Sequence, residues 1–165
     1  MSVLTFSARC AFLQYVLSCP LHIAVGTGDA SWGDVPPDPE YEATSLVNEK
    51  GRIRLTQWFY VNEDPDGDIE MPGKRFYKQS DTPTRMAYLF FACGYNDAPP
   101  NGIRGIREVG VFINTRAKSG LPARQIFLTP DQIDSPGTLL TLEHLTEPDN
   151  IIPDKRGGYE TILTI

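Results

Sequence analysis

Hydrophobic residues near the N-terminus recur at helical spacing. Phe6, Cys10, Leu13 and Leu17 follow one another at intervals of four, three and four residues, which places them on one face of an amphipathic helix. Pro20 comes directly afterwards, and proline disfavours continuation of a helix because it lacks the N–H that the helix needs. The pattern therefore predicts an N-terminal helix within residues 1–19.

The later apolar runs are short and rich in β-branched and aromatic residues, which is typical of strands. They cover residues 21–28, 52–61, 85–95 and 106–114, and shorter runs follow within 126–133, 137–145 and 159–165. The 85–95 run is dense enough that a helix remains an alternative there. Neither face of the 106–114 run is cleanly polar, so we expect a central or covered strand. The fold class predicted is mainly β, a β-sandwich-like single domain with an N-terminal α-helix and long irregular loops.

Two acidic segments interrupt the β-type pattern. Residues 29–42 contain three prolines and five acidic residues, a composition that predicts an irregular loop. Residues 62–73 are also acidic, and their Asp66-Gly67 dipeptide favours a hairpin turn. We therefore expect one domain over 1–165, in which a β-rich core over 20–165 carries acidic loops at 29–42 and 62–73.

Length and charge narrow the function classes. The chain has 165 residues, the size of one ordinary domain, and carries 15 Lys+Arg against 21 Asp+Glu for a net charge of -6. Such a charge argues against nucleic-acid binding, and the basic and aromatic residues at 74–78 are expected to form a surface strand or partner contact. The N-terminal apolar run is too short and polar to span a bilayer. We expect a soluble protein with protein partners and no membrane association.

Glycine and acidic motifs resemble ligand sites only in part. Gly26 and Gly28 follow a strand as in a dinucleotide fingerprint, but the third glycine and the helix are missing. The acidic stretch from Asn62 aligns with a calcium loop until its twelfth place, where Gly73 stands instead of a bidentate Glu. A plain turn and a solvated hairpin are the favoured interpretations, with no cofactor and no metal.

Nucleophilic catalysis has little support in the sequence. His22 lies in an apolar strand, where a packed and hydrogen-bonded residue is expected, and His144 lies in a late polar strand. Neither is near a nucleophile motif. The three cysteines lack metal or redox spacing and are expected to be reduced and structural: Cys10, Cys19 and Cys93. We expect no catalytic residues and no enzyme activity.

Three segments in order carry a family resemblance. LHIAVGTG at 21–28, SLVNEKGR at 45–52 and GIREVGVF at 105–112 resemble the motif series of bacteriophage tail proteins of the baseplate and tail-fibre-attachment, or tail-collar-like, kind. Val111 stands where the family has leucine. The residues that match the motifs are Gly26, Gly28, Leu46, Glu49, Arg52, Arg107, Glu108, Gly110 and Phe112.

The resemblance implies a virion structural protein of a phage tail. It would be a baseplate subunit or an adaptor that docks tail fibres or wedge proteins, present in multiple copies per particle and made in the host cytoplasm. Its partners would be other tail or baseplate proteins, including the N-termini of tail fibres. The alternative is a carbohydrate- or cell-surface-binding β-sandwich that uses exposed aromatic residues such as Trp32 and Tyr41.

The 29–42 loop is the candidate partner-binding element. Its prolines reduce the conformational freedom lost on docking, and its aromatic residues offer large contact areas. The candidate contact residues are Trp32, Pro36, Pro37 and Tyr41.

The acidic and basic motif residues are expected to hold the domain together. The resemblance suggests that Glu49 or Glu108 pairs with Arg52 or Arg107 inside the domain and joins the two motif segments. Their function would then be structural.

Overall fold

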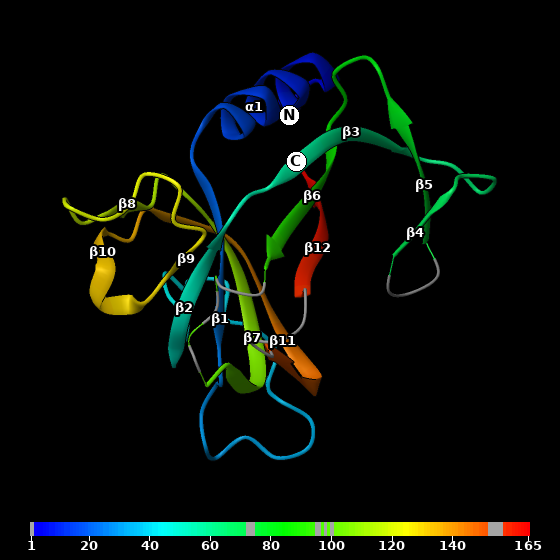
Figure 1. Cartoon of the computed structure of the whole chain (residues 1–165). Helices are drawn as coiled ribbons and strands as arrows, with labels where there is room; N and C mark the ends of the chain where they lie inside the picture. Colours follow the sequence, from blue (N-terminus) through cyan, green and yellow to red (C-terminus); the bar gives the residue numbers. More distant parts are fainter. Residues whose placement is uncertain (1, 72–74, 95–96, 98, 100, 152–156) are drawn as a thin grey trace. The chain divides into compact units, whose positions relative to one another are not determined.

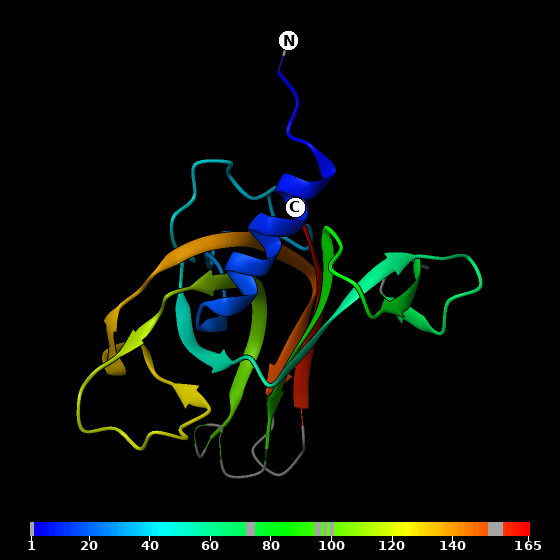
Figure 2. The ribbon, with the colours of Figure 1, turned by 90° about the horizontal axis from the view of Figure 1, so that it is seen from above.

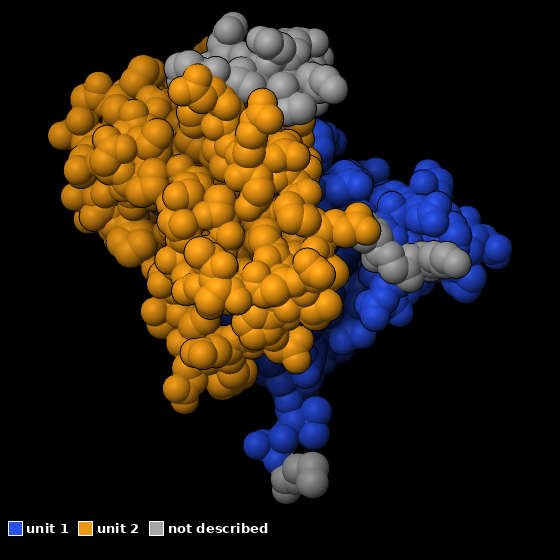
Figure 3. Space-filling model, turned by 90° about the horizontal axis from the view of Figure 1, so that it is seen from below, with its two compact units in different colours: residues 1–19, 56–90, 159–165 blue, residues 20–55, 91–158 orange. Residues whose placement is uncertain are grey.

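The computed structural model describes residues 2–71, 75–94, 97, 99, 101–151 and 157–165. It confirms the mainly β fold class, with antiparallel sheets and an N-terminal helix. The chain groups into two compact units, shown in Figure 3: unit 1 comprises Met1–Cys19, Thr56–Phe90 and Tyr159–Ile165, and unit 2 comprises Pro20–Leu55 and Phe91–Gly158. The assignment of 1–165 to a single domain stays a prediction.

The predicted N-terminal helix is α1, Phe6–Ser18. Thr5 caps its start by accepting a hydrogen bond from the Ala8 N–H (3.3 Å). Three of the four predicted positions are buried, together with Val16, but Phe6 is 61% exposed. That prediction was wrong because Phe6 is the first helical residue and the buried stripe begins one turn later. No helix among the described residues has the length and apolar character that crossing a membrane would need.

Unit 1 contains most of a five-stranded antiparallel sheet with the order β12-β6-β3-β5-β4. Val61, Met71, Tyr77 and Met86 form a buried cluster in this unit. The 85–95 run is a strand, as predicted, and the basic and aromatic run near 75 is a largely exposed strand, with Lys74 outside the described residues. The strands are β3 (Gln57–Glu63), β4 (Ile69–Met71), β5 (Arg75–Ser80), β6 (Met86–Cys93) and β12 (Gly157–Thr164).

Unit 2 is built on a second sheet with the order β11-β7-β1-β2-β9 (Figure 1). β7 pairs with β1 on one side and β11 on the other, so the strand predicted as central is central. Every residue of β1 is buried. The sheet contains β1 (Leu21–Gly26), β2 (Glu49–Arg54), β7 (Ile103–Ile113), β9 (Phe127–Leu128) and β11 (Thr138–Ile151); β8 (Arg116–Ala117) pairs with β10 (Ile133–Ser135), and a 3-10 helix covers Pro130–Gln132.

The single strand predicted over 52–61 is two strands. β2 ends at Arg54, and β3 begins at Gln57. The Leu55 N–H donates to the Leu21 carbonyl within unit 2, whereas the Thr56 N–H donates to the Phe90 carbonyl within unit 1 (2.9 Å each). The apolar run is therefore continuous in sequence but divided between two sheets.

The acidic turn forms without the predicted hairpin. The Gly67 N–H donates to the Asp64 carbonyl (3.0 Å), but β4 then pairs with β5, and β5 pairs with β3. The hairpin prediction was wrong because a turn dipeptide fixes only the local reversal, and pairing depends on the strands that follow. The predicted loop 62–73 contains β4, and its residues 72–73 lie outside the described residues.

Candidate functional site

Glu108 is the centre of a hydrogen-bonded cluster that joins the three motif segments. It is fully buried on β7. One carboxylate oxygen accepts from the N–H groups of Gly28 (3.2 Å) and Asn48 (2.7 Å), and the other accepts from the Val47 N–H (2.9 Å). Hydrogen bonds to a charged acceptor are stronger than neutral ones. Glu108 therefore fastens the end of β1 and the segment before β2 to β7.

The two glycines after β1 leave room for this cluster. A Cβ atom on Gly26 would lie 2.4 Å from Glu108 Oε1. Gly28 has a φ of +66°, and a Cβ there would lie 2.3 Å from the Trp32 ring. These glycines permit close packing around Glu108 and Trp32.

Arg52 is the centre of a second buried cluster of hydrogen bonds. It is 2% exposed, and its Nε and Nη2 atoms donate to the Glu49 carboxylate at 2.7 and 3.1 Å. The guanidinium carbon lies 3.7 Å from the centre of the Phe112 ring, and Nη1 donates to Thr115 Oγ1 (2.7 Å) and to the Pro136 carbonyl. Of the pairings predicted, Glu49 with Arg52 forms, but both residues belong to one motif segment, so the prediction that an ion pair joins two motif segments was wrong. The link to the third segment is the Phe112 ring, not an ion pair.

The remaining apolar motif residues pack in the same unit. Leu46 and Phe112 form a buried cluster with Ala24, against which Leu139 and Leu142 pack. A Cβ atom on Gly110 would lie 2.8 Å from Leu139 Cδ1 and 3.0 Å from Leu46 Cδ1. The three segments that carry the family resemblance therefore converge through local packing.

Arg107 holds the 29–42 loop, and the ion pairs among the described residues do not include it. Its guanidinium donates to the carbonyls of Trp32 (3.2 Å), Gly33 (2.7 Å) and Asp34 (3.2 Å). His144 Nδ1 lies 2.6 Å from the Pro37 carbonyl, and its ring centre lies 4.4 Å from that of Trp32. The loop is thus fastened to β7 and β11, and Figure 2 shows it passing beside β11.

The loop presents only part of the predicted contact set to solvent. Tyr41 is fully exposed and Pro37 is exposed, whereas Trp32 and Pro36 are half-buried. Val35 is 75% exposed, a contact candidate that the sequence did not indicate because a single valine among prolines has no distinguishing pattern. All five acidic residues of the loop are exposed: Asp29, Asp34, Asp38, Glu40 and Glu42.

His22 is packed, as expected, but incompletely hydrogen-bonded. It is buried on β1, and its Nδ1 atom has no hydrogen-bond partner among the described residues. Removal from water, together with the positive charges of Arg52 and Arg54, lowers its pKa to about 4. The side chain is therefore neutral near pH 7.

The cysteines are free thiols, as predicted. Cys10 and Cys93 are buried, and Cys19 is half-buried. Burial, with a smaller effect of the Asp97 carboxylate, raises the pKa of Cys93 to about 11, so this thiol is a poor nucleophile near pH 7.

Comparison with known proteins identifies a family. A family model described as "baseplate wedge 3 tail fiber network component" matches residues 1–165. No curated protein matches the chain. The family match confirms the resemblance to phage baseplate and tail-fibre proteins that the three motif segments indicated.

Proposed function

The chain belongs to the family of baseplate wedge 3 tail fiber network components, and from this membership we propose that it is an adaptor whose 29–42 loop docks a tail fibre or a neighbouring wedge protein. Family membership makes it a structural component of a phage baseplate. The docking role and the loop that performs it are the proposal. The observation that carries it is the exposed loop, which is fixed at its backbone by Arg107 and His144.

A fixed backbone favours docking because little freedom is lost when a partner binds. The loop carbonyls are held by side chains of β7 and β11, and the Trp32 ring packs on Gly28 and His144. A preorganised loop avoids part of the ordering cost of association. Trp32 therefore acts as an internal support, and the contacts with a partner fall to the side chains that face solvent.

The exposed side chains combine an aromatic anchor with negative charge. Tyr41 and Val35 supply apolar contact area. Five carboxylates surround them along the loop, so a basic patch on the partner is the complementary surface. Charge complementarity of this kind steers association and sets orientation.

Replacing the two exposed apolar residues will weaken attachment without loosening the loop. We expect V35S/Y41S to bind its particle partner about 30-fold more weakly, because truncating an aromatic anchor typically costs about 2 kcal/mol. Particles assembled with this variant will carry fewer fibres or wedge proteins, counted by electron microscopy and by quantitative mass spectrometry.

The matched control is F76S, which removes a 40% exposed aromatic side chain from β5 of unit 1. It should leave particle composition unchanged. Full fibre and wedge occupancy in V35S/Y41S particles, with the variant itself incorporated, would show that the loop does not dock the partner.

Neutralising the loop will slow assembly in a salt-dependent way. We expect D38N/E40Q/E42Q to associate about tenfold more slowly at low ionic strength, and the difference should shrink as salt screens the charges. The control D66N/D68N/E70Q removes the same number of exposed charges from unit 1. Equal association rates for the two triple variants, measured by stopped-flow light scattering, would contradict a specific role for the loop carboxylates.

A further inference from the structure

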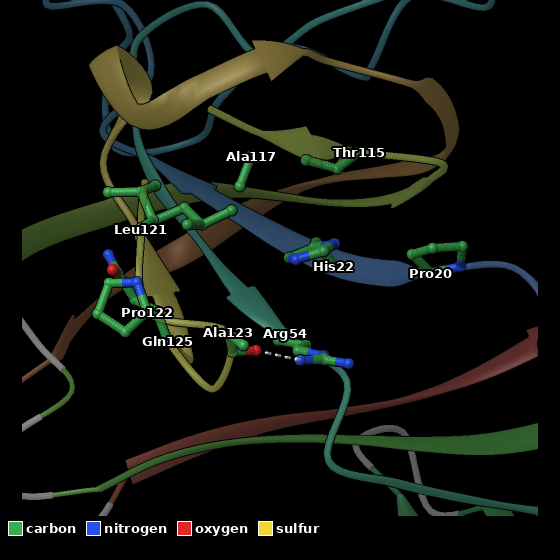
Figure 4. Close-up of a pocket in the computed structure, with 10 residues that line it drawn as sticks. Pro20, His22, Arg54, Thr115, Ala117, Leu121, Pro122, Ala123 and Gln125 are labelled. Atoms are coloured by element: carbon green, nitrogen blue, oxygen red, sulfur yellow. Dashed lines mark hydrogen bonds between the residues drawn. The ribbon is translucent and has the colours of Figure 1, made fainter. Parts of the chain in front are cut away.

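A pocket in unit 2 is lined by basic and apolar side chains, in contrast to the acidic 29–42 loop. It has a volume of about 240 Å³, and Figure 4 shows the side chains around it. His22 of β1 and Arg54 of β2 line it, and Leu121 and Pro122 form an apolar side. None of the described residues that line it is acidic.

Arg54 brings a positive charge that no described carboxylate neutralises. Its side chain is exposed, and Nη1 makes one long hydrogen bond to the Ala123 carbonyl (3.4 Å). The ion pairs among the described residues do not include Arg54, whereas the neighbouring Arg52 is paired with Glu49. A guanidinium has five N–H donors, so most of those of Arg54 remain available.

Most other polar groups of the pocket already form hydrogen bonds within the protein. Thr115 Oγ1 donates to the Pro136 carbonyl (3.0 Å), and the Gln125 amide donates to the Phe127 carbonyl (2.9 Å). His22 is 7% exposed, and its Nδ1 atom is unpartnered among the described residues. The free binding capacity is therefore the Arg54 charge, the His22 imidazole and the apolar wall.

We propose that this pocket binds a carboxylate-bearing segment of a neighbouring tail protein, with the carboxylate at Arg54 and an adjoining apolar group against Leu121 and Pro122. Arginine pairs with carboxylates through two parallel hydrogen bonds, and the aliphatic wall requires an apolar part in the ligand. The pocket thus adds a second contact, of opposite charge to the 29–42 loop.

The binding test uses N-acetyl-leucine as the carboxylate probe and N-acetyl-leucinamide as its neutral match. NMR shifts of the His22 ring and of the Ala117 and Ala123 methyl groups report occupancy, since all three residues line the pocket. We expect the acid to bind at least about tenfold more tightly than the amide, and R54Q to lose that preference. The control R85Q changes an exposed arginine of unit 1 and should keep it. Equal shifts with acid and amide, or an unchanged preference in R54Q, would overturn the proposal.

The source of the carboxylate is tested in assembled particles. A photo-reactive amino acid at position 123 should cross-link to an Asp-, Glu- or C-terminus-containing segment of a neighbouring tail protein, and R54Q should abolish that cross-link. Probe binding without any cross-link to a tail protein would assign the pocket to a free organic acid and overturn the partner. Because Val35 and Tyr41 are unchanged in these variants, the result is independent of whether the loop docks a fibre.

Discussion

Replacing Glu108 by alanine will lower the free energy of unfolding by about 4 kcal/mol, because one buried and two half-buried hydrogen bonds from backbone N–H groups lose their acceptor at once. The N–H groups belong to Gly28, Val47 and Asn48, which lie in two segments far from Glu108 in sequence. Each unsatisfied buried donor typically costs about 1–3 kcal/mol. Urea unfolding followed by circular dichroism measures the loss.

Two variants separate this effect from a general loss of charge. E143A removes an exposed carboxylate from β11, next to β7 in the same sheet, and should change stability by less than about 0.5 kcal/mol. E108Q keeps the side-chain size and one carbonyl acceptor but points an amide NH₂ at backbone donors, so we expect a loss between those of the other two variants. A Glu108→Ala loss as small as that of Glu143→Ala would refute the role of Glu108 as the joining node.

Local sequence patterns predicted most helices and strands, but only part of the hydrogen-bonded cluster around Glu108. Residue alternation placed Glu108 on the same face of its strand as Ile106, Gly110 and Phe112, and an acid on an apolar face is a signal of a buried polar group. Its acceptor role could not be read from sequence because the donors are backbone N–H groups, which every residue except proline carries. An arginine was therefore the wrong partner to expect for Glu108, which accepts hydrogen bonds from backbone N–H groups instead. The ion pair between Glu49 and Arg52 does form.

For the 29–42 loop, too, the sequence predicted the local structure but not the contacts with residues distant in sequence. Its prolines predicted irregular structure over 29–42, and no helix or strand forms there. The contacts that fix it come from Arg107 and His144, which bind loop carbonyls more than 70 residues away in sequence. Every residue carries a carbonyl acceptor, so the sequence does not indicate which carbonyl groups these side chains bind. The sequence also does not show that the Trp32 ring, a predicted partner contact, packs against His144.

Acidification will destabilise the fold through His22 by about 3 kcal/mol. The pKa of this histidine is about 4 in the folded protein and 6.5 in the unfolded chain. Between these values the unfolded chain binds a proton that the folded protein does not, so stability falls as the pH decreases from 6.5 to 4. Above pH 6.5 His22 is neutral in both states, so the fold keeps its full stability. Below pH 4 His22 is protonated in both states, and the full loss of about 3 kcal/mol has occurred.

The variant H22Q isolates this contribution because glutamine is polar and does not titrate. All other residues are the same in the two proteins, so their effects on the two stability curves cancel in the difference. We expect the stability of the wild type relative to H22Q to fall by about 3 kcal/mol between pH 7 and pH 4, measured by urea unfolding at each pH. Parallel curves over this range would show that burial and the two arginines do not hold His22 neutral, and the pocket beside Arg54 would then have to accommodate a charged imidazole.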